Sequence, residues 1–269
     1  MSTLQIPPAL SLEALESVPG VLGQISRERY EDYKDCAVAE LEDVQRPSFK
    51  QALQQPGLSI IAEIKRSSPS QGAIADLEPV EAAQAYLRGG ASALSVLTEM
   101  RHFGGRLEYL QSVADAVTLP LLRKDFTVHP QQIIEARNLG ASAVLLIVAV
   151  LGERTHDYLT YAQALGLDAL VEVHDEAELD IALDAGADII GVNNRNLQTL
   201  TIDTRNAPKL IERAKKQGYG GVLVAESGYK AAEELLELVG LADAVLIGTS
   251  LAGSGDLEAG VNRLKRVLE

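Results

Sequence analysis

The sequence predicts an α/β protein built as a closed (β/α)8 barrel with a helical extension at its N-terminus. Three observations lead to this prediction. From Leu58 onward, eight short apolar runs alternate with segments of helical periodicity, which is the pattern of a parallel sheet. The chain has 269 residues, close to the roughly 250 of a typical barrel, and no linker divides it. Charged or amide side chains end five of the eight runs, at the edge where such barrels hold their active sites.

Residues 1–57 precede the first apolar run, and we expect them to form an N-terminal helical extension packed on the barrel of residues 58–269. The chain is then a single domain overall. Apolar residues recur with helical spacing near 11–26 and 28–43, which predicts two helices. The Arg46-Pro-Ser-Phe49 segment breaks this pattern because proline lacks the backbone donor that a helix needs. We expect the extension to cap one end of the barrel.

The eight apolar runs are the predicted strands, and glycine-containing segments precede several of them. One example is Leu139-Gly-Ala-Ser142, where glycine ends a helix and small residues let the next strand begin close by. An open, doubly wound sheet is the alternative fold. It is less favoured because no glycine-rich fingerprint follows the first run, whereas eight strands suit the closed TIM barrel. The predicted strands lie near 58–65, 92–97, 119–123, 142–150, 168–173, 188–192, 221–225 and 243–247.

Composition excludes several classes of function. A net charge of -14 argues against nucleic acids and anionic membranes as partners, because both are bound through basic surfaces. The longest apolar run, 143–151, is far shorter than the roughly 20 residues of a membrane helix, so we expect a cytoplasmic protein. We also expect a monomer. Cys36 is the only cysteine, which excludes an internal disulfide. The four histidines lack the spacing of a zinc or iron site, and no metal is expected.

Polar groups at the strand ends are the candidate catalytic residues. Glu63 and Lys65 stand two residues apart at the end of one run, so their side chains share a face. For this pair alone, a core ion pair and a functional site are equal alternatives, but the recurrence at other strand ends favours a site. His174 shares the face of Glu172 and is expected to be a hydrogen-bond partner rather than the base. The strand-end groups are Glu63, Lys65, Lys124, Glu172, Asn193 and Glu226.

Two glycine-containing segments predict a phosphate site. Glu226-Ser-Gly228 follows the seventh run and Gly248-Thr-Ser250 follows the eighth. Each offers backbone N–H groups where a helix or turn begins, which is how proteins commonly bind anions. Either segment alone would be explained as an ordinary turn with a hydroxyl cap. Their occurrence together, after the seventh and eighth strands of a barrel, favours phosphate.

Taken together, these residues resemble the indole-3-glycerol phosphate synthase family through nearly the whole barrel. The resemblance implies an enzyme that closes 1-(2-carboxyphenylamino)-1-deoxyribulose 5-phosphate to indole-3-glycerol phosphate, with loss of carbon dioxide and water. It implies no cofactor and a phosphorylated small molecule as substrate. The IIAEIKRSSPS segment at 60–70 is highly specific, whereas the last two matching segments also occur in other phosphate-binding barrels. The remaining matches are at 97–99, 123–126, 145–147, 171–173, 191–197, 225–228 and 246–251.

The resemblance also implies roles for individual residues. Lys124 provides the proton or positive charge that a ketone oxygen needs during carbon–carbon bond formation. The later acid and base steps fall to Glu172, Lys65 and Glu63, whose division of labour the sequence leaves open, and Lys65 is alternatively an anion-binding residue. Asn193 and Ser227 orient the substrate.

The remaining implied positions bind the two ends of the substrate. Backbone and side-chain groups that hold phosphate are Lys65, Ser227, Gly228, Gly248 and Thr249. Residues in or beside the site are Ser68, Arg195 and Glu226. Apolar side chains that enclose the aromatic ring are Phe103, Phe126, Leu145 and Leu197, while Leu200 is explained equally well by core packing.

Two other functions suit a phosphate-binding barrel. One is another barrel enzyme acting on a phosphoribosyl compound, such as an isomerase of tryptophan or histidine biosynthesis, which would use a different acid–base pair. The other is a noncatalytic sensor of a phosphorylated ligand, which would be expected to lack one of the two lysines or two glutamates. Glu63, Lys65, Lys124 and Glu172 are all present, which favours the synthase.

Overall fold

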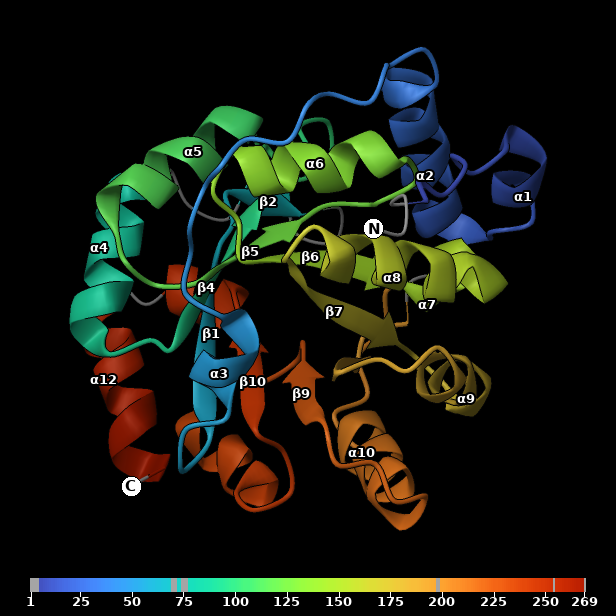
Figure 1. Ribbon diagram of the computed structural model, residues 1–269. Coiled ribbons are helices and arrows are strands. Elements are labelled where there is room, and N and C mark those ends of the chain that lie inside the picture. Colours follow the sequence, from blue (N-terminus) through green and yellow to red (C-terminus); the bar gives the residue numbers. More distant parts are fainter. Residues whose placement is uncertain (1–4, 69–71, 74–76, 197–198, 254, 269) are drawn as a thin grey trace.

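The computed structural model describes residues 5–68, 72–73, 77–196, 199–253 and 255–268, and their backbone forms a closed barrel (Figure 1). Eight parallel strands pair in the order β1-β10-β9-β8-β7-β6-β5-β4, and β1 also pairs with β4. This closure confirms the predicted (β/α)8 fold. A short antiparallel pair, β2 (Ser67–Ser68) and β3 (Gly72–Ala73), follows β1. The barrel strands are β1 (Ser59–Ile64), β4 (Ala93–Leu97), β5 (Leu121–Lys124), β6 (Ala143–Ile147), β7 (Asp168–Val173), β8 (Ile189–Asn193), β9 (Val222–Glu226) and β10 (Ala244–Ile247).

Helices surround the barrel and bury their apolar faces against it. In α10, for example, Leu210 and Ile211 are buried while Lys215 and Lys216 face solvent. No helix within the described ranges has both the length and the apolar character required to cross a bilayer. The helices after β1 are α4 (Pro79–Gly89), α5 (Leu107–Ala116), α6 (Pro130–Asn138), α7 (Val148–Leu151), η1 (Gly152–Arg154), α8 (Thr155–Ala164), α9 (Glu176–Asp184), α10 (Asn206–Lys216), η2 (Ala232–Leu238), α11 (Thr249–Ala252) and α12 (Leu257–Leu268).

The predicted strand near 142–150 was wrong at its C-terminal end. Strand β6 ends at Ile147, and Val148–Leu151 forms the short helix α7. Both elements are apolar and buried except for the partly buried Ala149, so the run contains no periodicity that separates a strand from a helix.

The predicted helices of the extension were also partly wrong. The chain forms α1 (Leu12–Glu16), α2 (Gly20–Tyr33) and α3 (Phe49–Leu53) in place of helices over 11–26 and 28–43. Pro19 is extended and precedes α2, because a proline disfavours helix in the residue before it and lacks the donor needed within one. No helix or strand occurs in residues 36–48.

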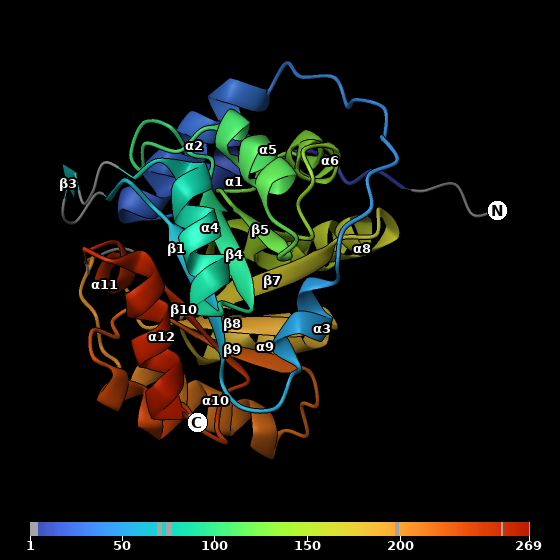
Figure 2. The ribbon, with the colours of Figure 1, turned by 90° about the vertical axis from the view of Figure 1, so that its left-hand side faces the viewer.

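The extension reaches both ends of the barrel, whereas we expected it to cap one end. Near the carboxyl ends of the strands, the Leu10 N–H donates to the Val128 carbonyl at 2.9 Å. At the opposite end, the Lys50 N–H donates to Asp168, the first residue of β7, at 2.9 Å. The segment 34–48 connects α2 to α3 along the outside of the barrel (Figure 2). The division of the chain at residue 57 remains a prediction.

Candidate active site

A cavity of about 520 Å³ opens at the carboxyl ends of the barrel strands. Most of the residues predicted from the sequence line it, so residues far apart in the chain meet at one place. Those predicted residues are Glu63, Lys65, Phe103, Lys124, Phe126, Leu145, Glu172, Asn193, Arg195, Ser227, Gly228, Gly248 and Thr249.

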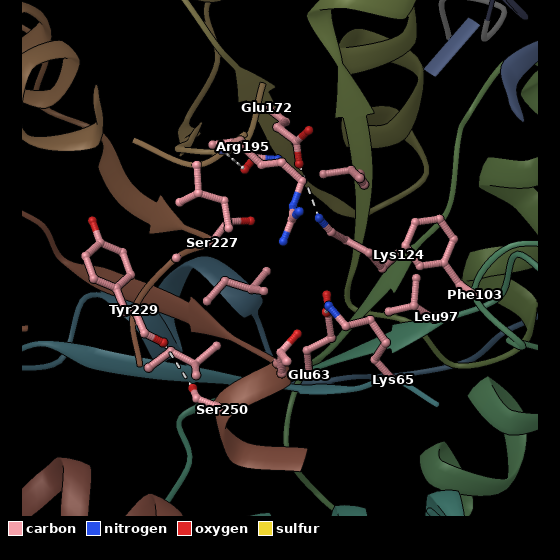
Figure 3. A pocket seen from close by; sticks show the side chains of 18 of the residues that line it. Glu63, Lys65, Leu97, Phe103, Lys124, Glu172, Arg195, Ser227, Tyr229 and Ser250 are labelled. Atoms are coloured by element: carbon pink, nitrogen blue, oxygen red, sulfur yellow. Dashed lines mark hydrogen bonds and ion pairs between the residues drawn. The ribbon is translucent and has the colours of Figure 1, made fainter. Parts of the chain in front are cut away.

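Lys124 projects from the end of β5 into the cavity toward Glu172 (Figure 3). Its Nζ lies 3.2 Å from Glu172 Oε2 on β7 and 3.2 Å from Glu226 Oε2 on β9. Both glutamates are buried, and Glu226 Oε1 has no hydrogen-bond partner among the described residues. Glu226 is therefore held mainly by its contact with Lys124.

These charges determine the protonation of the site. Burial opposes the charge on Lys124, but the carboxylates of Glu226, Glu172 and Glu63 hold its pKa well above the usual value. Lys124 is accordingly protonated and can donate. Burial likewise opposes the charge on Glu172, yet the ammonium of Lys124 lowers the pKa of this carboxyl. For Glu226, burial raises the pKa, the nearby charge of Glu172 adds to the rise, and Lys124 offsets it only in part.

His174 lies behind Glu172, away from Lys124. Its Nε2 is 3.3 Å from Glu172 Oε1 without good hydrogen-bond alignment, and its Nδ1 is 2.9 Å from Glu178 Oε2. Burial lowers the pKa of His174, but the two carboxylates outweigh burial and raise the pKa to about 10. The imidazolium is thus an ion-pair neighbour of Glu172, while its hydrogen bond goes to Glu178.

Glu63 and Lys65 form an ion pair on the opposite wall, with 2.7 Å between Lys65 Nζ and Glu63 Oε1. Ser95 Oγ donates to the other carboxylate oxygen of Glu63 at 3.3 Å. A Cβ added to Gly248 would lie 2.6 Å from Glu63 Oε1 and 3.2 Å from Lys65 Nζ. Glycine at this position therefore leaves the space that the ion pair occupies.

Asn193 ends β8 and Arg195 follows it, and both border the cavity. The Arg195 N–H donates to Asn193 Oδ1 at 3.0 Å, which fixes the amide of this buried side chain. Arg195 Nη1 donates to the carbonyl of Leu200 at 3.3 Å. Leu200 itself has φ of 60° and does not line the cavity. Leu197 lies outside the described residues.

The loops after β9 and β10 form the wall where phosphate was predicted. Ser227 and Gly228 have φ of 66° and 98°, and a Cβ on Gly228 would lie 2.6 Å from Ile202 Cγ2. Only glycine suits both this backbone conformation and this close contact. Ser250 Oγ donates to the Tyr229 carbonyl at 3.0 Å and so joins the two loops (Figure 3).

An apolar wall faces these loops across the cavity. The rings of Phe103 and Phe126 pack with their centroids 5.9 Å apart, and Leu97, Leu145 and Ile147 line the same cavity. Figure 3 shows Leu97 and Phe103 on the side of Lys124, and Ser227 and Ser250 on the other. The cavity thus has one apolar side and one side rich in backbone donors.

Three groups of residues differ from the sequence prediction. Glu226, expected in or beside the site, does not line the cavity but contacts Lys124, which does. Ser68 lies in β2, but its side chain is outside the described residues. Several lining residues were not predicted, because their local sequence resembles that of ordinary core or loop positions. These are Leu97, Asp125, Ile147, Ile202, Tyr229, Lys230, Leu246, Ile247 and Gly253. Ser250, part of the predicted anion-binding segment 248–250, also lines the cavity. Across the described ranges, no group of three or more His, Cys, Asp or Glu side chains could hold a metal ion.

Comparisons with known proteins identify one family. A sequence model of the family described as "Indole-3-glycerol phosphate synthase" matches residues 23–264. An indole-3-glycerol phosphate synthase of Deinococcus radiodurans is 55% identical over 266 residues, covering 96% of this chain and 97% of that protein. The enzyme of the same name from Mycolicibacterium smegmatis is 49% identical over 217 residues, covering 78% and 77%.

Solved structures show the fold at much lower identity. A thiamine phosphate pyrophosphorylase from Pyrococcus furiosus aligns with a TM-score of 0.58 and 16% identity, covering 80% of this chain and 97% of that chain. At this identity the likeness concerns the barrel alone.

Proposed function

The chain belongs to the indole-3-glycerol phosphate synthase family, and we propose that Lys124, Glu172, Glu63 and Lys65 carry out the chemistry of that enzyme. The reaction is the ring closure of 1-(2-carboxyphenylamino)-1-deoxyribulose 5-phosphate to indole-3-glycerol phosphate, with loss of carbon dioxide and water. It is a carboxy-lyase step of tryptophan biosynthesis. The position of the Lys124 ammonium, between an apolar wall and two loops rich in backbone donors, is the observation that carries the proposal.

The two sides of the cavity orient the substrate. The carboxyphenyl ring packs against Phe103, Phe126 and Leu145, and the phosphate binds at the loops of Ser227 and Gly248. The ketone carbon lies between these two ends of the substrate, so this orientation places it near Lys124. Holding both ends of a flexible substrate lowers the entropic cost of bringing the reacting carbons together.

Lys124 assists the first step, in which the ring carbon that bears the carboxylate attacks the ketone carbon. The carbonyl π electrons move to oxygen, and the protonated Lys124 donates a proton there. Carbon dioxide then leaves, and the electrons of the broken bond restore the aromatic ring. Its carboxylate neighbours keep Lys124 protonated in the free enzyme, which suits an acid that must be ready before the substrate arrives.

Glu172 and the Glu63–Lys65 pair serve the dehydration that follows. The hydroxyl leaves as water after it receives a proton, while a base removes a proton from the ring carbon beside the nitrogen, and the electrons of that C–H bond form the new ring double bond. Glu172 lines the cavity and its lowered pKa keeps it ionised, so it is able to accept this proton as the base of the step. Lys65, ion-paired with Glu63 on the opposite wall, supplies the proton to the hydroxyl.

Turnover by Lys124 variants tests this assignment. Lys124→Ala should fold normally and lose kcat by a factor of about 10²–10⁴, the usual contribution of a general acid. Lys124→Arg should fail as well, since arginine stays protonated and does not give up its proton. Product formation is followed by indole fluorescence. Near-normal kcat in folded Lys124→Ala would refute the role of Lys124.

Inorganic phosphate tests the other end of the cavity. It should inhibit competitively against the phosphorylated substrate, and Gly228→Ala should weaken this inhibition because Gly228 approaches Ile202 closely at positive φ. Phosphate bound elsewhere in a soaked crystal would contradict the assignment. A cytoplasmic location and a monomeric state complete the proposal, and sedimentation of the purified chain measures the second.

A further inference from the structure

We propose that Arg29, in the N-terminal extension, is a positioning residue that keeps Lys124 in its catalytic position by binding the carboxylate of the adjacent Asp125. The inference rests on the proposed role of Lys124. Arg29 touches neither the cavity nor a substrate group, and it lies 96 residues from Asp125 in the sequence.

The contact between Arg29 and Asp125 is a buried, two-pronged ion pair. Arg29 Nε donates to Asp125 Oδ1 at 3.0 Å, and Nη2 donates to Oδ2 at 2.8 Å. Arg29 is 8% exposed and Asp125 is 1% exposed. The planar guanidinium matches both carboxylate oxygens, so it fixes the orientation of the carboxylate as well as its distance.

Asp125 transmits this constraint to the end of β5. Its carboxylate also accepts hydrogen bonds from Thr98 Oγ1 at 2.7 Å, Arg123 Nη2 at 2.9 Å and the N–H of Phe126 at 2.8 Å. These donors come from β5 itself, from the end of β4 and from the residue that follows Asp125. The Asp125 carboxylate therefore connects Thr98, Arg123 and the Phe126 backbone, which surround Lys124 in the structure.

The extension also reaches the residue on the other side of Lys124. Tyr33 of α2 accepts a hydrogen bond from Arg123 Nη2 at 3.1 Å and donates to Glu135 at 2.6 Å. Arg123 is 2% exposed and points away from the cavity, because side chains alternate along a strand and Lys124 points into it. Both neighbours of Lys124 are thus anchored to α2, and the lysine between them has little freedom to shift.

The proposed reaction depends on the exact position of Lys124. Lys124 stands 3.2 Å from each of two glutamates, and its proton must reach a ketone oxygen whose position is set by distant parts of the substrate. A displacement of about 1 Å at such a group lowers a rate by on the order of 100-fold. A contact that fixes the backbone of Lys124 can therefore affect the rate of the chemical step, even though it lies outside the cavity.

Single-turnover rates of Arg29 variants test the proposal. The full-length chain is mixed with a limiting amount of the carboxyphenylamino-deoxyribulose phosphate, and indole fluorescence is followed at a temperature where circular dichroism shows each variant folded. We expect Arg29→Met to lower the chemical rate by on the order of 10–100-fold with little change in KM. Arg27→Met is the matched control, because Arg27 lies on the same helix and donates to Leu15 of α1 instead of to the barrel.

Arg29→Lys keeps the charge but loses the two-pronged contact, so it should fold and show an intermediate rate. If Arg29→Met does not fold, the rate of Arg29→Lys tests the proposal instead. A rate within twofold of the wild type in a folded Arg29 variant, or a rise in KM alone, would overturn the proposal and leave Arg29 a purely stabilising residue. Lys124→Ala is measured in the same assay. If it retains turnover, the proposed function fails, whatever Arg29 does.

Discussion

Gly191 on β8 leaves free the space that the carboxylate of Glu226 on β9 fills, since a Cβ on Gly191 would overlap Glu226 Oε1. The two strands are neighbours in the barrel, with Gly191 paired to Val224, and Glu226 reaches over this glycine toward Lys124. The missing side chain of Gly191 thus sets where one carboxylate of the site can lie.

Gly191→Ala should therefore displace Glu226 from Lys124. We expect kcat to fall by on the order of 10–100-fold, because the carboxylate that helps hold the ammonium moves. Gly220→Ala provides the control, since a Cβ there would meet no atom within 4 Å. Steady-state kinetics and thermal unfolding of both variants measure the effect. Unchanged kcat in a folded Gly191→Ala would show that Glu226 adapts without consequence.

Glu172→Gln should impair kcat much more than KM. The amide keeps the shape of the side chain but cannot accept a proton, and such transfer contributes a factor of about 10²–10⁴. Kinetics across a range of substrate concentrations separate the two constants. If only KM rose, Glu172 would be a binding residue and the base would have to be sought at Glu63.

Gly248→Ala should lower kcat with little loss of stability. Gly248 has φ of -119°, outside the left-handed region that requires glycine, but the added Cβ would press on Glu63 Oε1 at 2.6 Å. The Glu63–Lys65 pair must then move. A phosphate contact alone predicts a different result, namely a raised KM and a normal kcat. The pair of constants, together with the inhibition constant of inorganic phosphate, decides between them.

The stabilising effect of His174 should depend on pH. Its pKa rises from 6.5 to about 10 on folding, because Glu172 and Glu178 favour the charged ring over the opposing effect of burial. A group whose pKa is raised on folding stabilises fully below its unfolded pKa and loses this effect as pH rises through the folded pKa. The difference in Tm between wild type and His174→Asn should therefore shrink between pH 6.5 and about 10. A constant difference would contradict this, and the exposed His156→Asn is the control.

Phe49→Ala should destabilise the protein without changing its catalysis. Phe49 begins α3 at the end of the barrel opposite the cavity and is completely buried. Removing a buried ring of this kind costs about 3–5 kcal/mol of unfolding free energy. Denaturant unfolding measures the loss, and kcat at a temperature well below Tm should match the wild type. A fall in kcat there would couple this end of the extension to the site.

The barrel strands were predictable because each is marked by a pattern within a few consecutive residues. Each strand is a short apolar run, and polar residues such as Lys124 and Glu172 stand at its carboxyl end, where the fold brings them together. The helix at Val148–Leu151 was missed for the same reason that the strands were found, since its apolar run continues that of β6. Pro19 did contain a signal that would have divided the first predicted helix.

The supporting groups of the site could not be predicted in this way. Ile202 and Tyr229 lie in loops whose course depends on positive φ at Ser227 and on contacts between loops. The pairing of Arg29 with Asp125 joins two charged residues 96 positions apart, and nothing in either local sequence identifies the partner. Only the closed barrel determines which distant residues become neighbours.

The contacts of the extension also bear on the order in which the protein acquires structure. Residues 5–53 are synthesised before the barrel strands, yet Ala39 binds Gln131 across 92 residues and Lys50 binds Asp188 across 138. Contacts this remote close only after most of the intervening chain exists, so this segment should dock after the barrel strands that are synthesised later. Pulsed hydrogen exchange during refolding would then show the Ala39 N–H protected later than those of β4 and β5, and earlier protection would disprove this order.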